Sequence, residues 1–182
     1  MCTAMELRRS HTLLVSIILF SAVILCTDVI AATIYVRPPE SIDACSTAYS
    51  NIQAAIDASV NGDTIIVAPG TYTGLGNRDI DFQGKAITLR SANGPDTCII
   101  DCNGSRDEPH RGFYFHSNED ANSVLDGFTI TGGYATEMPD CYFDEPISPI
   151  FPNEPFGGAV YCEDAAPTII NCKIVSNTAC AP

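Results

Sequence analysis

The feature that most constrains the fold is a short β-branched run with turn residues on both sides. Residues 64–67 read Thr-Ile-Ile-Val, with Gly62-Asp63 in front of them and Pro69-Gly70 shortly behind. An apolar run of this length between turn signals is typical of a buried β-strand. The sequence therefore predicts a strand over residues 64–67, and later segments repeat its pattern.

The segment before this strand predicts an amphipathic helix over about residues 50–60. Its apolar residues recur at helical spacing, and Ser50 or Asn51 stands where a side chain caps the first turn. The arrangement Asn-Ile-Gln-Ala-Ala-Ile-Asp-Ala, then Gly-Asp-Thr-Ile-Ile-Val-Ala-Pro-Gly-Thr-Tyr, closely resembles the opening of right-handed parallel β-helix proteins of the pectin lyase-like superfamily. In that family the helix caps the open end of the solenoid. The resemblance covers residues 50–74 and is specific for fold rather than for chemistry.

Two sets of similar segments follow one another along the chain. The first set comprises Ile80-Asp81, Ile100-Asp101, Leu125-Asp126 and Ile170-Asn171. The second set comprises residues 65–67, 87–89, 113–115 and 159–161. Periods of roughly 20–50 residues are the signature of stacked repeats. We therefore predict an all-β fold: a right-handed parallel β-helix of about four coils over residues 32–182, with a short N-terminal capping α-helix.

The acidic positions of the first set predict a structural polar ladder. Their side chains fall at the end of one strand in each copy, where they would bond to neighbouring turns. Calcium binding or catalysis by this acid column is the weaker alternative. The ladder residues are Asp81, Asp101, Asp126 and Asn171. In the same register, Ile100, Leu125 and Ile170 are expected to stack inside the coil.

Residues 1–31 have the composition of a secretory signal peptide. Arg8 and Arg9 precede an apolar run from Leu13 to Cys26, and small residues follow it at the predicted cleavage site. The run is shorter than the ~20 residues that a membrane-spanning helix needs. We expect a secreted, extracellular or cell-surface protein without a membrane anchor after cleavage.

The charge and the cysteines limit the partners. A formal net charge of −13 repels nucleic acid. Of the nine cysteines, Cys2 and Cys26 leave with the signal peptide, so an odd number stays and at least one thiol is left over even if disulfides form. The spacing of the cysteines and histidines matches no zinc pattern.

An insertion is predicted at about residues 134–156, because the interval between copies lengthens there and five prolines exclude a central strand. A long loop in a solenoid is typical of a functional or a disordered segment. Its aromatic candidates for stacking on sugar rings are Tyr134, Tyr142 and Phe143, and its candidate metal ligands are Asp140, Asp144 and Glu145. The pattern requires no cofactor, and calcium is the ion that these carboxylates would suit. The alternative is a passive loop whose aromatic residues cover the sheet.

The superfamily that this chain resembles includes pectinolytic enzymes. Their catalytic sequence signatures are not found in this chain. His110-Arg111 with His116 offers a base and a cation, but His116 also fits an outward strand position without a role. The leading prediction is a non-catalytic binding or structural module whose partner is a polysaccharide or a cell-surface glycan. The alternative is a polysaccharide-degrading enzyme, of the pectate lyase or glycoside hydrolase kind. Since no capping element follows residue 176, we also expect stacking on further coils or on a partner at that end.

Overall fold

The computed structural model describes residues 30–38, 47–135 and 157–179. Residues 31–182 form one compact unit, and Met1–Ile30 form a second unit, of which only Ile30 belongs to the described part. The predicted signal peptide, apart from its last two residues, lies outside the described residues, as does most of the predicted insertion at 134–156. Within the described residues, no helix is both long and apolar enough to cross a bilayer.

The helix α2 (Ile52–Ala58) forms where the helical spacing predicts it. Asn51 is its N-cap, and the side-chain oxygen of Asn51 accepts a hydrogen bond from the backbone N–H of Ala54 at 2.8 Å. Ile52 and Ile56 point inward and are fully buried. The predicted helix is confirmed, and of the two candidate caps, Ser50 and Asn51, the structure has Asn51.

Strands form three parallel sheets, and each sheet takes one strand from each successive coil. Sheet A contains β1 (Thr33–Val36), β2 (Thr64–Val67), β5 (Thr88–Ser91), β8 (Val124–Asp126) and β11 (Thr168–Ile170). Sheet B contains β3 (Gly70–Thr73), β6 (Cys98–Asp101), β9 (Thr129–Thr131) and β12 (Lys173–Ile174). Sheet C contains β4 (Ile80–Asp81), β7 (Phe113–Phe115) and β10 (Val160–Cys162). The strand predicted over residues 64–67 is β2.

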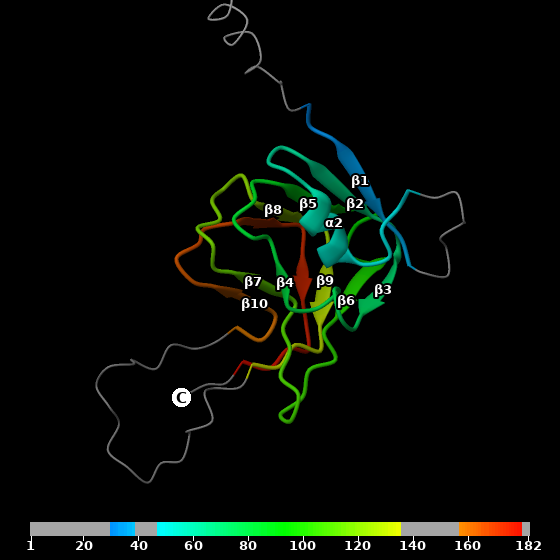
Figure 1. Ribbon diagram of the computed structural model, residues 1–182. Coiled ribbons are helices and arrows are strands. Elements are labelled where there is room, and N and C mark those ends of the chain that lie inside the picture. Colours follow the sequence, from blue (N-terminus) through cyan, green and yellow to red (C-terminus); the bar gives the residue numbers. More distant parts are fainter. Residues whose placement is uncertain (1–29, 39–46, 136–156, 180–182) are drawn as a thin grey trace, which may run out of the picture. The chain divides into compact units, whose positions relative to one another are not determined.

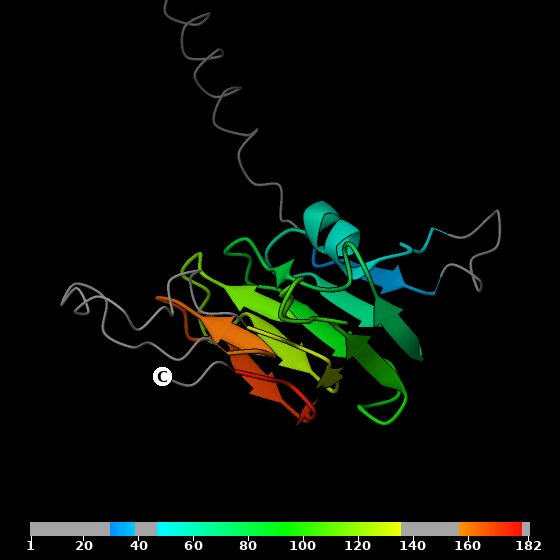
Figure 2. The same cartoon turned by 90° about the horizontal axis from the view of Figure 1, so that it is seen from below.

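The chain visits the sheets in the order A, B, C and then returns to A one layer further on. Figure 1 looks along the stack from the α2 end, and the path from β2 through β3 and β4 to β5 runs clockwise while it recedes. Figure 2 shows the coils stacked in chain order, with α2 across the first of them. The fold is a right-handed parallel β-helix with an N-terminal capping helix, as the sequence predicts.

The interior consists of columns of apolar side chains that stack from coil to coil. In sheet A, Ile65 pairs with Leu89 and Leu89 pairs with Leu125. In sheet B, Ile100 pairs with Ile130. All five side chains are fully buried. The alternation of the strands thus places every second residue in the core and leaves the residues between them on the outer faces.

The two sets of similar segments identified in the sequence do not correspond to single columns. Ile100 lies in sheet B, whereas Leu125 lies in sheet A and pairs with Ile169. Ile170 pairs with Asp126 and is 44% exposed. The predicted inner stack of Ile100, Leu125 and Ile170 is therefore wrong. The error arises because the coils differ in length, so that spacing alone aligned different strands of the coil.

The second set is mixed in the same way. Residues 65–67 and 87–89 fall in or beside strands of sheet A, whereas residues 113–115 and 159–161 fall in or beside strands of sheet C. The second set therefore does not form a single column of one sheet either.

Candidate functional site

The outer face of sheet C carries the densest group of interacting polar and aromatic side chains among the described residues. Strand β7 alternates, so that Phe113 and Phe115 are fully buried while Tyr114 between them faces outward. Phe115 packs edge-on against Phe82, with ring centroids 4.9 Å apart. The packing of these aromatic rings determines which face of β7 points inward, and the side chain of Tyr114 therefore points outward.

The register of sheet C places Tyr114 between two outward residues on neighbouring coils. Asp81 of β4 pairs with Tyr114 on one side, and Tyr161 of β10 pairs with it on the other. The two tyrosine rings lie 5.3 Å apart between centroids and are tilted by 40°. Two aromatic faces therefore follow each other along the stack of coils, as a sugar chain lying along the stack would require.

A guanidinium group lies over both rings. The Cζ atom of Arg111 is 5.6 Å from the centroid of Tyr114 and 5.0 Å from that of Tyr161. These distances are within the range of cation–π attraction, which is strongest when the pair is partly shielded from water. The charge of Arg111 is thus held over the two rings of the aromatic pair.

Hydrogen bonds tie the rings to carboxylates. The hydroxyl of Tyr114 donates to Oε2 of Glu163 at 3.1 Å. Burial, and then this hydrogen bond, raise the pKa of Tyr114 above its ordinary value, so the hydroxyl stays a donor at neutral pH. His116 stacks on Tyr114 at 4.0 Å, and its Nε2 lies 3.3 Å from Oδ2 of Asp81. We call the group that these contacts define the sheet C strip: Asp81, Arg111, Tyr114, His116, Tyr161 and Glu163.

A third carboxylate, that of Asp79, holds the segment before β7. Asp79 has a positive φ of 52°, and its Oδ1 accepts the backbone N–H of Arg111 at 2.8 Å. Its Oδ2 lies 2.6 Å from Nδ1 of His110. Asp79 therefore positions the backbone from which the Arg111 side chain reaches the two rings.

The strip has the chemistry of a sugar-binding surface. Aromatic faces take the apolar faces of sugar rings, while the guanidinium and the carboxylates bond hydroxyl groups. His116 beside Asp81 also has the form of an oriented general base. In the described residues, no group of three or more His, Cys, Asp or Glu side chains is arranged to hold a metal ion.

The predicted loop ligands are mostly beyond the described part of the chain. Tyr142, Phe143, Asp140, Asp144 and Glu145 lie outside the described residues, so their roles stay predictions.

Tyr134 is described and is partly buried. It forms a parallel bridge with Thr178, and its backbone N–H donates to the carbonyl of His110 at 2.7 Å. Its backbone therefore belongs to the coil at the point where the insertion leaves it.

The four residues predicted to form one polar ladder lie in or beside strands of three different sheets. Asp81 belongs to the strip, Asp101 ends β6 in sheet B, and Asp126 ends β8 in sheet A. Only Asp126 and Asn171 bond to each other among the four, with Nδ2 of Asn171 donating to Oδ1 of Asp126 at 2.7 Å. A single four-membered column is therefore wrong, and the structural role of each position stays a prediction.

Sequence reasoning missed Tyr161 and Glu163 as site residues. It placed Phe115 opposite Tyr161, whereas the residue opposite Tyr161 is Tyr114. An alignment that is wrong by one residue exchanges the inner and outer faces of a strand. For this reason the sequence comparison did not identify the tyrosine pair. The alternation in Phe-Tyr-Phe-His, matched one position later against Val-Tyr-Cys-Glu, was the signal that would have found it.

Comparison with curated proteins finds a distant similarity to an enzyme. The chain is 32% identical over 127 residues to "Pectate lyase PEL9" of Emericella nidulans, which covers 62% of this chain and 31% of that protein. The chain thus spans about a third of the length of the relative that it matches. No family model and no solved structure matches the chain. The distant similarity to a pectate lyase agrees with the three parallel sheets and with a pectate lyase-like β-helix fold.

Proposed function

We propose that the chain is a secreted or cell-surface β-helix module that binds a polysaccharide through the sheet C strip without cleaving it. The observation that carries the proposal is the pair of outward tyrosines on successive coils, Tyr114 and Tyr161, with Arg111 over both rings. Neighbouring strands lie ~4.8 Å apart, so this arrangement offers an outward strip of two tilted aromatic rings rather than an enclosed pocket. The similarity to a pectate lyase adds support for a polysaccharide partner.

The pairing of the polar groups favours binding over catalysis. Glu163 already accepts from the hydroxyl of Tyr114, so this carboxylate is engaged within the strip. Side chains that form hydrogen bonds with one another in this way make a surface rigid. The second candidate is a polysaccharide-degrading enzyme, which the name of the relative favours, with His116 and Arg111 as the base and the cation.

Binding is tested by calorimetric titration with oligogalacturonate and, separately, with neutral xylo-oligosaccharides. Tyr161→Ala removes one of the two stacking faces, so we expect affinity for the bound oligosaccharide to fall roughly tenfold. Tyr35→Ala is the matched control, because Tyr35 is an exposed tyrosine of sheet A. Unchanged affinity in Tyr161→Ala would place the binding surface elsewhere.

The enzyme alternative is tested with polygalacturonate and calcium, by following unsaturated products in the ultraviolet. We expect no product. Turnover that disappears in Arg111→Ala or His116→Ala would replace the binding role with a lyase role.

The insertion is tested by deleting residues 137–154. Its two ends meet in the fold, because a Cβ atom added at Gly133 would lie 2.0 Å from the carbonyl oxygen of Gly158. We expect the deletion to leave the β-helix folded by circular dichroism. If calcium binds through Asp140, Asp144 and Glu145, calorimetry will detect calcium binding to the intact protein and none after the deletion. Loss of folding would show instead that the insertion belongs to the core.

Secretion is tested by expressing the full chain in a host with an export pathway and sequencing the N-terminus of the product. We expect a mature protein that starts at Ala32. Material that keeps residues 1–31 would contradict the signal-peptide prediction.

A further inference from the structure

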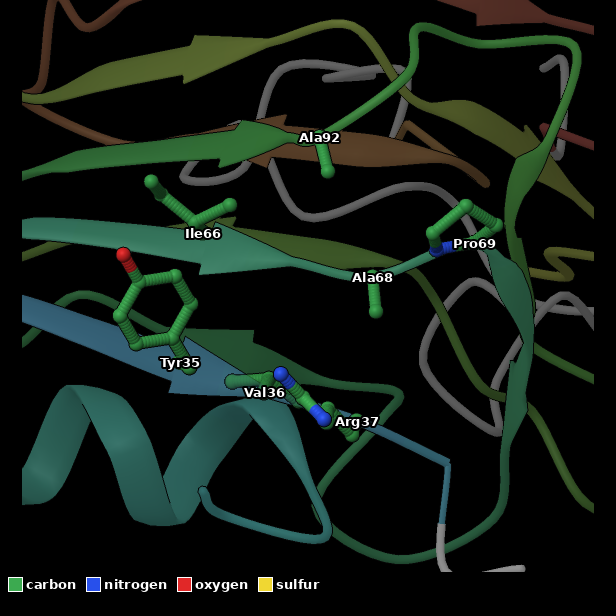
Figure 3. A pocket seen from close by; sticks show the side chains of 7 residues that line it. All are labelled: Tyr35, Val36, Arg37, Ile66, Ala68, Pro69 and Ala92. Carbon is green, nitrogen blue, oxygen red and sulfur yellow. The ribbon is translucent and has the colours of Figure 1, made fainter. Parts of the chain in front are cut away.

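An open hollow of about 370 Å³ lies on the outer face of sheet A, away from the strands of the sheet C strip. It is lined by residues of β1 and β2 and by residues that directly follow β1, β2 and β5 (Figure 3). Among the described residues that line it, none belongs to the strip. It is therefore a separate feature of the surface.

The hollow lies beside two large outward side chains, at a place where the residues that follow strands β2 and β5 have small side chains. Tyr35 and Ile66 stand in register on β1 and β2, and Figure 3 shows their side chains on one side of the hollow. Beyond the strands, the parallel ladder continues as the backbone N–H of Ala68 bonds to Val36 at 2.9 Å. Ala68 and Ala92 each add only a methyl group there, and the depression lies over them.

Arg37 supplies a charge at the rim of this apolar hollow. Tyr35 and Arg37 are two residues apart on an extended chain, so their side chains point to the same face. Tyr49 holds the backbone of both residues: its N–H donates to the carbonyl of Tyr35 at 2.8 Å, and its carbonyl accepts from the N–H of Arg37 at 3.0 Å. Val36 and Pro38 on either side of Arg37 are buried, which fixes its Cα position.

The guanidinium of Arg37 has no ion-pair partner among the described residues. The protein around it carries a formal net charge of −13. An arginine without a carboxylate partner on such a surface is an attachment point for an anionic group, and the planar guanidinium matches a carboxylate in two parallel hydrogen bonds.

We propose that this hollow binds an aromatic ring that carries a carboxylate, with the ring against Tyr35, Ile66 and the two alanines and the carboxylate on Arg37. The lining decides between an aromatic acid and an acidic sugar. Among the described residues of the lining, only Tyr35 and Arg37 carry polar side-chain groups, a hydroxyl and a guanidinium. The several hydroxyls of a sugar would lose hydrogen bonds to water without replacement, whereas an aromatic ring has none to lose.

The test uses the full protein and three probes: 4-hydroxycinnamate, its methyl ester, and galacturonate, with binding measured by ligand-observed NMR. For a ligand of this size we expect a dissociation constant on the order of 1 mM for 4-hydroxycinnamate. Arg37→Gln should weaken the acid about fivefold and leave the ester unchanged. Tyr35→Ala should weaken both.

Two further variants separate a specific site from general effects. Arg106→Gln removes an exposed arginine that does not line the hollow and should change nothing. Ala68→Leu fills the hollow without touching the charge and should abolish binding of acid and ester alike. Tyr161→Ala should leave the affinity for the aromatic acid intact, so failure of this proposal and failure of the glycan proposal are distinguishable.

Three outcomes would overturn the proposal. The first is a galacturonate affinity equal to or higher than that of 4-hydroxycinnamate. The second is equal loss of affinity in Arg37→Gln and Arg106→Gln, which would indicate unspecific attraction. The third is the absence of binding of any probe to the unaltered protein at 10-fold the expected dissociation constant, a concentration on the order of 10 mM.

Discussion

The coils next to α2 and the last described coil have the same inner columns but differ in burial. In sheet A, Ile65 and Leu125 are fully buried, whereas Ile169 in the same column is 36% exposed. In sheet B, Ile130 is fully buried and its neighbour Ile174 is 54% exposed. The register determines which side chains point inward. An inward side chain is buried only where neighbouring coils cover it on both sides. An inner position in a β-helix is therefore a necessary condition for a core residue and not a sufficient one.

Thiol reactivity should show the largest difference between buried and exposed side chains. Burial raises the pKa of both Cys98 and Cys102 to about 12, so at pH 8 only about one such thiol in ten thousand is ionised. Cys162, in the last complete coil, is exposed. In reduced, folded protein we expect a thiol reagent to label Cys162 and to spare Cys98 and Cys102 until urea unfolds the chain. Peptide mapping identifies the labelled sites.

The same shifts set a direction for alkaline stability. In the folded state the pKa of each of these two thiols is about 12, whereas the ordinary pKa of a cysteine thiol is 9.0. Unfolding therefore releases protons between pH 9 and pH 12. Their contribution to stability is present below pH 9 and is lost as the pH rises through this window. Equal labelling of Cys102 and Cys162 in folded protein would contradict both statements.

Removing an aromatic side chain from the covered region should cost the most stability. Phe115 is fully buried and contacts Phe82 and Phe113, with ring centroids 4.9 and 6.2 Å away. Phe115→Ala leaves a cavity that the stiff coil does not close, so we expect the free energy of unfolding to fall by about 3–5 kcal/mol. Urea unfolding followed by circular dichroism measures it. A loss below about 1 kcal/mol would mean that the aromatic interior is not packed as described.

A buried carboxylate between coils comes next in size. Glu119 is 2% exposed, and its two oxygens accept the backbone N–H groups of Gly84 and Ser117, both at 2.8 Å. Glu119→Gln turns one acceptor into a donor that faces an N–H group, so we expect a loss of about 1.5–3 kcal/mol. Asp120→Asn, at an exposed neighbour, is the control and should change stability by less than about 0.5 kcal/mol. Similar losses in both variants would assign the effect to net charge.

The sequence was sufficient for the features that depend on local signals. The cap at Asn51, the helical spacing and the turn residues around β2 act within a few residues of one another, so helix, strand and fold class could be predicted. Register depends on how long each coil is, and Thr64 pairs with Thr88, Thr88 with Val124, and Val124 with Thr168, at a different spacing each time. Matching the repeats by their spacing therefore assigned strands of different sheets to one column.

The candidate site was only partly predictable for the same reason. His110, Arg111 and His116 are close in sequence and were recognised together. Tyr161 reaches Tyr114 only through the register of β10 on β7, across the long connection that contains the insertion. Their pairing depends on one residue of register, which the spacing between repeats does not fix.

The smallest stability effect should come from the last described coil, and it tests the opening comparison most directly. Ile174 and Ile130 stand in register in one column of sheet B, so the two positions differ in burial and not in side chain. Ile130→Ala should lower the free energy of unfolding by about 2–5 kcal/mol, because a fully buried side chain leaves a cavity. Ile174→Ala should cost less than about 1 kcal/mol, since more than half of that side chain already contacts water. Both values come from the same urea unfolding experiment. If the two losses are equal, something covers β12 in the folded protein, and the difference between the two regions does not exist in solution.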